Sequence, residues 1–155
     1  MLGADATTFA AVFAALYAAH EVGDHWMQTH AQACGKEAPG WAGRILCAKH
    51  VVTLAATKAA ALTLMAVVIG IPLHPAAVGT ALAVDGVSHY WADRRVTLAA
   101  LAEWLGRRII PGKGDFYRLG NGKAAPTGTG AYALDQSWHV GWLFIAALIG
   151  CMGVA

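Results

Sequence analysis

Apolar residues gather in four blocks along the chain, and stretches rich in glycine, proline or charge separate them. The blocks cover residues 6–32, 44–70, 75–105 and 132–155. A helix needs about 20 apolar residues to cross a bilayer, and the second and fourth blocks come closest. The pattern predicts an all-α fold, an integral membrane four-helix up-and-down bundle that forms a single domain over residues 1–155. The apolar runs of the first and third blocks end early, at His20 and Asp85, which leaves open whether these two helices cross fully.

The composition indicates that lipid surrounds this bundle. Of the 155 residues, 57% are hydrophobic and 13% are charged, whereas a soluble domain carries about 25% charged residues. The formal net charge of +2 is too small to indicate a nucleic-acid partner. We therefore expect the lipid bilayer as partner and no nucleic acid. The six tryptophans are expected to anchor the helices at the membrane interfaces.

Basic residues are concentrated in and beside two of the predicted loops. One is the loop between the first two helices, and the other is the long basic loop 106–130 between helices three and four. The residues concerned are Lys36, Arg44, Lys49, Arg94, Arg95, Arg107, Arg108, Lys113, Arg118 and Lys123. Because cytoplasmic loops carry the excess of Lys and Arg, we expect both basic loops in the cytoplasm and both termini outside.

Histidine and aspartate residues recur at a spacing of four in three of the blocks. In an up-and-down bundle this spacing places each pair on one helix face, at the cytoplasmic end of its helix. The fourth helix reverses the order of the pair, as an antiparallel partner would if Asp formed an outer layer and His an inner one. The candidate residues are His20, Asp24, His50, His89, Asp93, Asp135 and His139, with Gln28 and Gln136 as supporting residues.

Imidazole and carboxylate groups that converge inside a bundle favour a divalent transition metal. Zinc, manganese and iron all fit such a set of ligands. The same residues would also suit a network of polar side chains that satisfy one another at the membrane interface, or a proton relay. The pattern therefore predicts a common location for these side chains and leaves their chemistry open.

Lys58 and Asp85 lie eight residues deeper in their helices than His50 and Asp93, which corresponds to about 12 Å at the helical rise. An unpaired charge at that depth is costly. We therefore predict that the two side chains form an ion pair separate from the His/Asp set. The alternative is that Lys58 tunes a site or contacts an anionic substrate.

The ordered set of polar motifs resembles a family of small bacterial and phage membrane proteins, the domain of unknown function 3307 family. The resemblance covers nearly the whole chain, and Asp135-Gln-x-x-His139 is its most specific element. It implies a bundle in the bacterial inner membrane with the polar positions acting as a unit, and it implies no established reaction. A looser similarity to membrane-bound metal-dependent hydrolases implies hydrolysis.

Three functions are consistent with these patterns. The first is a membrane protein with a cytoplasm-facing metal site, which as an enzyme would use a metal-activated water on an anionic or lipid-linked substrate. The second is a non-enzymatic membrane protein that acts through protein contacts, for instance between phage and host. The third is a small ion or proton transporter that uses the His and Asp residues.

Overall fold

A computed structural model describes residues 5–122 and 128–153, and every regular element in those ranges is a helix. The predicted all-α class is therefore confirmed for the described part of the chain. Lys123 and parts of the predicted loop 106–130 and of the last block lie outside the described residues, as do residues 1–4.

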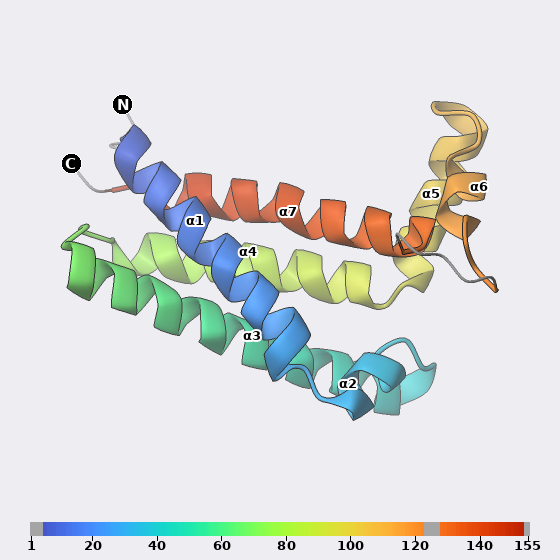
Figure 1. The fold of residues 1–155 in the computed structure, drawn as a ribbon, viewed down its shortest axis with the longest axis horizontal. Coiled ribbons are helices and arrows are strands. Elements are labelled where there is room, and N and C mark those ends of the chain that lie inside the picture. Colours follow the sequence, from blue (N-terminus) through green and yellow to red (C-terminus); the bar gives the residue numbers. More distant parts are fainter. Residues whose placement is uncertain (1–4, 123–127, 154–155) are drawn as a thin grey trace.

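Four long helices form an antiparallel bundle (Figure 1). They are α1 (Ala6–Val22), α3 (Gly40–Ile69), α4 (Pro75–Asp93) and α7 (Gly130–Gly150). The pairs in closest contact follow the order α1, α3, α4, α7 and back to α1, so each long helix packs beside two others. As a consequence, α1 begins and α7 ends at the same end of the bundle as the turn between α3 and α4.

Local sequence signals explain where these helices begin and end. The side chain of Asp5 caps α1 by accepting hydrogen bonds from the backbone N–H groups of Thr7 and Thr8. Pro75 occupies the first turn of α4, where its missing N–H costs nothing. Gly70 ends α3 in the left-handed conformation, with φ of 75°.

Shorter helices lie at the opposite end of the bundle, where they change three of the predicted boundaries. The first block is not one helix, because a π-helical turn, η1 (Gly23–Met27), follows α1 and leads to α2 (His30–Gly35). The third block is also divided, because Arg95 adopts φ of 52° between α4 and α5 (Val96–Arg108). The loop predicted from residue 106 contains α6 (Lys113–Arg118).

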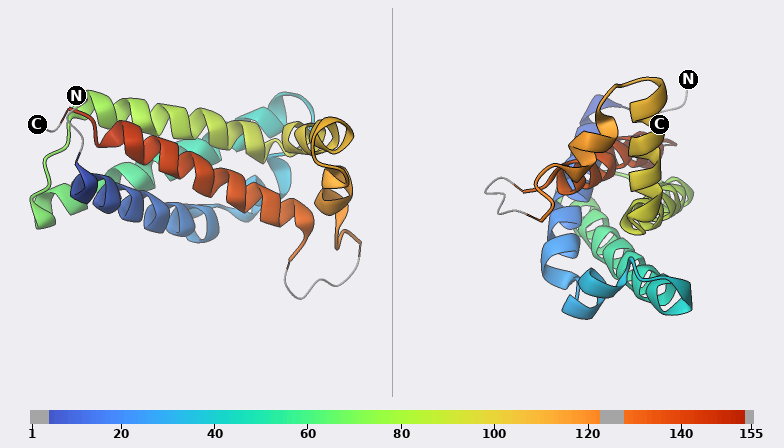
Figure 2. Two further views of the ribbon diagram at one scale, coloured as in Figure 1. Left: turned by 90° about the horizontal axis from the view of Figure 1, so that it is seen from above. Right: turned by 90° about the vertical axis from the view of Figure 1, so that its right-hand side faces the viewer.

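Helix α5 runs across the end of the bundle (Figures 1 and 2). It packs against α6, and α6 in turn packs against α7, so these two short helices form a cap beside the start of α7. The cap therefore lies on the end of the bundle where η1 and α2 also lie.

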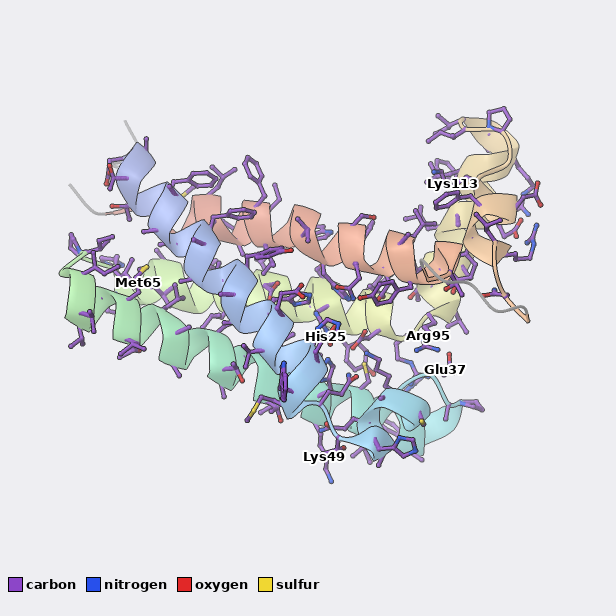
Figure 3. All side chains as sticks on the ribbon, viewed as in Figure 1. His25, Glu37, Lys49, Met65, Arg95 and Lys113 are labelled. Carbon is purple, nitrogen blue, oxygen red and sulfur yellow. The ribbon has the colours of Figure 1, made fainter. Side chains whose placement is uncertain are left out.

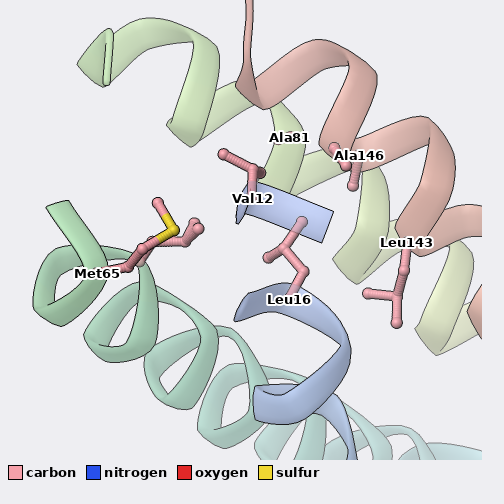
Figure 4. Packing of buried hydrophobic residues seen from close by; sticks show 8 residues of the cluster. Val12, Leu16, Met65, Ala81, Leu143 and Ala146 are labelled. Carbon is pink, nitrogen blue, oxygen red and sulfur yellow. The ribbon is translucent and has the colours of Figure 1, made fainter. Parts of the chain in front are cut away.

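The apolar core fills the half of the bundle near the start of α1 and the end of α7 (Figure 4). All four long helices contribute to it, and its buried members are Val12, Leu16, Leu62, Met65, Ala81, Leu143, Ala146 and Ala147. The buried polar side chains lie in the other half, where histidines, aspartates and two lysines are enclosed together with a few apolar residues such as Leu54 and Ala92. The two halves of the interior thus differ in chemistry along the bundle axis.

Among the described residues, one helix meets the length and composition expected of a membrane span. Helix α3 has 30 residues, and only 22% of its most apolar window is buried inside the bundle. Helix α1 has 17 residues, fewer than the roughly 20 needed to cross a bilayer. Helices α4 and α7 carry Asp, His or Gln within their length, which lowers their hydropathy.

Lys58 and Asp85 meet between the apolar core and the polar end. The Nζ of Lys58 donates a hydrogen bond to Oδ2 of Asp85 over 2.5 Å, and the two side chains are 0% and 5% exposed. Lys58 comes from α3 and Asp85 from α4, so the ion pair joins two neighbouring helices. Each charge is desolvated and depends on the other for compensation.

Lys58→Met should lower the free energy of unfolding by about 3–5 kcal/mol, because it leaves the carboxylate of Asp85 buried without a cation. Chemical unfolding of the detergent-purified protein measures this change. Lys49→Met, at an exposed position on the same helix, is the matched control and should have little effect. The double variant Lys58→Met/Asp85→Leu should recover much of the loss. Equal stabilities for the two single variants would contradict the role of the ion pair.

Candidate metal centre

The polar end of the bundle brings side chains from η1, α3, α4 and α7 to one place. His50 lies on α3, His89 and Asp93 on α4, and His139 on α7, and all four are at most 2% exposed. Asp24 joins them from η1, with a side chain 7% exposed. Sequence spacing alone placed these five residues at one end, and the structure brings them into contact.

A first group of donor atoms surrounds the imidazoles of His50 and His89. Their Nε2 atoms face each other at 3.0 Å. Oδ1 of Asp24 lies 2.9 Å from Nε2 of His50 and 3.8 Å from that of His89. In a tetrahedral site with bonds of 2.0–2.1 Å, neighbouring ligand atoms are about 3.3 Å apart. These three atoms therefore have the mutual spacing of ligands on one face of such a site.

Asp93 extends this group from the other side. Its Oδ2 lies 3.4 Å from Nε2 of His50 and 3.1 Å from Nε2 of His89. Its Oδ1 accepts a hydrogen bond from Nζ of Lys36 over 2.8 Å and lies 3.8 Å from Nε2 of His139. The carboxylate of Asp93 is thus shared among three imidazoles and one ammonium group.

The π-helical turn explains how Asp24 reaches His50. A π-helix has a wider turn than an α-helix, so residues four apart no longer share one face. Among the described residues no ion pair joins His20 on α1 to Asp24, whose carboxylate contacts His50 instead, although both side chains lie at the same end of the bundle. Gly23 allows the turn to approach α3 closely, because an added Cβ would overlap the side chain of Leu54.

Lys36 is the residue of this site that the sequence pattern did not identify as a site residue. Its position depends on how the chain between α2 and α3 folds. The guanidinium group of Arg94 donates hydrogen bonds to the carbonyl oxygens of Lys36 and Ala38 over 2.6 and 2.8 Å, and so ties this segment to the end of α4. Lys36 itself is 6% exposed. No spacing rule in the sequence connects it to Asp93, which is 57 residues away.

His139 and Asp135 form the side of the site nearest the cap. Nε2 of His139 lies 3.5 Å from Oδ1 of Asp135, four residues earlier on α7. The ring of His139 stacks on that of His89, with centroids 3.9 Å apart. The side chain of Asp135 is 21% exposed, so it lies between the buried imidazoles and the surface.

The remaining predicted residues differ in how close they lie to the site. His20 is fully buried, and its ring lies 5.5 and 5.2 Å from the rings of His89 and His139, centroid to centroid. Nε2 of Gln136 lies 3.4 Å from Oδ2 of Asp24 and so contacts the site. Gln28 follows η1 in an extended conformation and does not continue the helix face predicted for it.

Four buried ligand atoms at this site lack a hydrogen-bond partner among the described residues: Oδ1 of Asp24, Oδ2 of Asp93, Oδ1 of Asp135 and Nε2 of His139. Nδ1 of His50 and His89, on the far side of rings whose Nε2 atoms face the site, and both ring nitrogens of His20 are also buried without a partner. Burial of a polar atom without a partner costs free energy. Nitrogen and oxygen donors in this arrangement are ligands that zinc, manganese and iron accept, so the residues present fit a divalent metal ion.

The charges of the site also fit a divalent cation. Among the residues that the structure describes, the carboxylates of Asp24, Asp93 and Asp135 face a single ammonium group, that of Lys36. The cluster therefore has a charge of about −2 when its imidazoles are neutral. Excess negative charge in a buried site is costly unless a cation compensates it. One divalent ion would balance this cluster.

A cavity of about 430 Å³ adjoins the site on the side of the cap. Asp135 lines it together with Arg95, Glu37, Tyr117 and others. Arg95 donates a hydrogen bond to Oε2 of Glu37 over 3.1 Å, and Figure 3 shows the two side chains facing each other between α2 and α5. Burial raises the pKa of Tyr117, so its hydroxyl remains a neutral hydrogen-bond donor. The cavity therefore offers a polar route to Asp135.

No protein-family model, curated protein or solved structure matches the chain. The resemblance to the domain of unknown function 3307 family therefore stays a prediction based on the spacing of its polar motifs.

Proposed function

We propose that this protein is an integral membrane protein that binds a divalent transition metal ion at the cytoplasmic end of its bundle and hydrolyses an anionic or lipid-linked substrate there. One observation carries the proposal: buried imidazole and carboxylate atoms from separate elements converge on the same point, and many have no hydrogen-bond partner among the described residues. A network of polar side chains that served only stability would be expected to satisfy those atoms internally.

The first ligands in this proposal are His50, His89, Asp24 and Asp93. Nε2 of His50 and His89 lies within 3.8 Å of Oδ1 of Asp24 and within 3.4 Å of Oδ2 of Asp93, and none of the four side chains is more than 7% exposed. Lys36 neutralises part of the charge of Asp93 and holds its Oδ1, which leaves Oδ2 directed towards the two imidazoles. When bound, a divalent ion polarises a substrate oxygen and activates water for attack.

Residues around the ligands would contact the water and the substrate during hydrolysis. Asp135 lies at the border between the imidazoles and the cavity, so its carboxylate is the first of the site that a water or substrate entering through the cavity would meet. Arg95, on the wall of the same cavity, can contact an anionic group of a substrate once it leaves Glu37. The long apolar helices would hold a lipid-linked substrate at the depth of the site.

The distribution of side chains over the bundle supports the membrane location. The interior of its polar half holds buried histidines, aspartates and Lys58, whereas large apolar residues on the outside of α3 are exposed. Val52, Leu64, Val67, Val68 and Ile69 are between 64% and 76% exposed. Such an arrangement is stable where lipid covers the outside, and polar residues within spans face the bundle interior.

Exposed tryptophans support a membrane interface at the polar end, and basic residues support its orientation. Trp26 in η1 and Trp41 at the start of α3 are 84% and 74% exposed, and both lie at the polar end of the bundle. Exposed Trp side chains are enriched where a membrane meets water. The basic residues of α5 and α6 lie at the same end, which the positive-inside rule assigns to the cytoplasm.

The protein should remain in the membrane pellet after an alkaline carbonate wash, and Cys34 should react with a membrane-impermeant maleimide in inside-out vesicles only. Cys34 is exposed on α2 at the polar end, whereas Cys47 and Cys151 are buried. Cys34→Ser is the control and should remove the labelling. Release of the protein by carbonate would contradict the membrane location, and labelling of right-side-out vesicles would contradict the orientation.

Purified protein that has been offered zinc, manganese and iron should retain at least one of these metals, as measured by elemental analysis. His50→Ala and His89→Ala should each weaken binding roughly 100-fold or more, because each removes a buried ligand. His30→Ala is the matched control, since His30 is exposed on α2 and lies away from the donor group. Absence of bound metal in the wild-type protein, or equal binding by all three variants, would contradict the proposal.

A further inference from the structure

The two oxygen atoms of Asp93 face different groups of donor atoms. Oδ2 is directed towards Nε2 of His50 and His89, at 3.4 and 3.1 Å. Oδ1 is directed towards Lys36 and towards Nε2 of His139, at 3.8 Å. A carboxylate with its two oxygens so divided is the usual bridge between two metal ions in helical bundles.

The group around Oδ1 has unused ligands of its own. Nε2 of His139 lies 3.5 Å from Oδ1 of Asp135, yet both atoms are buried and neither has a hydrogen-bond partner among the described residues. His139 is 98% buried, because its relative exposure is 2%. An imidazole and a carboxylate that lie side by side without a mutual hydrogen bond have the arrangement of two ligands directed at one cation.

We propose that Asp93 Oδ1, His139 Nε2 and Asp135 Oδ1 form a second divalent-cation position, bridged by Asp93 to the first. This inference rests on the proposed function, because the bridge requires an ion on the side of His50 and His89. Paired ions of this kind lie about 3.5–4 Å apart and clamp an oxyanion between them. Because Arg95 lies on the wall of the adjoining cavity, the substrate class that fits such a pair best is a phosphate-like oxyanion.

Access to the second position comes through the cavity beside Asp135. The side chain of Asp135 is 21% exposed and lines that cavity, whereas the side chains of His50 and His89 are at most 1% exposed. An ion at the second position is therefore nearer to solvent than an ion at the first. It would exchange more readily and would be the one that a substrate reaches first.

Charge predicts a difference in affinity between the two positions. One divalent ion balances the three carboxylates and Lys36, so a second ion leaves the cluster with about two surplus positive charges. Inorganic phosphate that enters through the cavity would compensate that surplus. The second ion should therefore bind more weakly than the first, and phosphate should increase the affinity of the second position for its ion.

Manganese(II) tests this inference, because electron paramagnetic resonance separates an isolated ion from a coupled pair. Wild-type protein titrated with Mn²⁺ should bind one ion tightly and, with inorganic phosphate present, a second ion that converts the isolated-ion spectrum into an exchange-coupled one. Asp135→Asn and His139→Asn should keep the first ion and lose the coupled signal. Asn121→Ala is the matched control, since Asn121 lines the same cavity but contributes no ligand, and it should keep the pair.

The outcomes separate the two proposals. One ion in the wild-type protein and no coupled signal with phosphate would overturn the second position and leave the proposed function intact. A coupled signal that survives Asp135→Asn would overturn the assignment of Asp135 as a ligand. If Asp135→Asn and His139→Asn each lost both ions, the division into two positions would be overturned. Absence of any ion in the wild-type protein would overturn both proposals. The first ion retained by the variants also shows that they are folded.

Discussion

The carboxylate of Asp93 is the contact on which the polar end of this bundle depends. It lies within 3.8 Å of Nε2 of His50, His89 and His139 and within 2.8 Å of Nζ of Lys36, so it joins α4 to α3, to α7 and to the segment after α2. A carboxylate that is 1% exposed persists only if cations or hydrogen-bond donors surround it. Lys36 supplies such a donor, and Arg94 holds Lys36 in place by donating to the carbonyl oxygens of Lys36 and Ala38.

The same constraint divides the bundle along its axis. Apolar side chains pack the half that contains Leu16 and Leu143, and the Lys58–Asp85 pair separates that half from the imidazoles. Large apolar side chains on the outside of α3 are exposed, and most of them lie along the apolar half of the bundle. In the proposed location at the boundary between lipid and cytoplasm, such a site would receive water and polar substrates without opening the apolar half.

The sequence predicted the parts of this arrangement that follow from helical periodicity. Four apolar blocks indicated the four long helices, and the spacing of four placed His89 with Asp93 and Asp135 with His139. Helical periodicity did not reveal the π-helical turn at Gly23–Met27, from which Asp24 contacts His50 on α3. Lys36 could not be predicted either, because its contact with Asp93 depends on the tertiary fold of the segment between α2 and α3.

X-ray absorption spectroscopy of the zinc-loaded protein would test the proposed metal centre itself, because it reports the atoms bound to the ion. We expect only nitrogen and oxygen ligands at about 2.0–2.1 Å, with the outer-shell scattering of at least two imidazole rings. Asp93→Asn should change that set of ligands, whereas His30→Ala, at an exposed position, should leave it unchanged. A spectrum of zinc bound by water alone, or by sulfur, would contradict a centre built from His50, His89, Asp24 and Asp93.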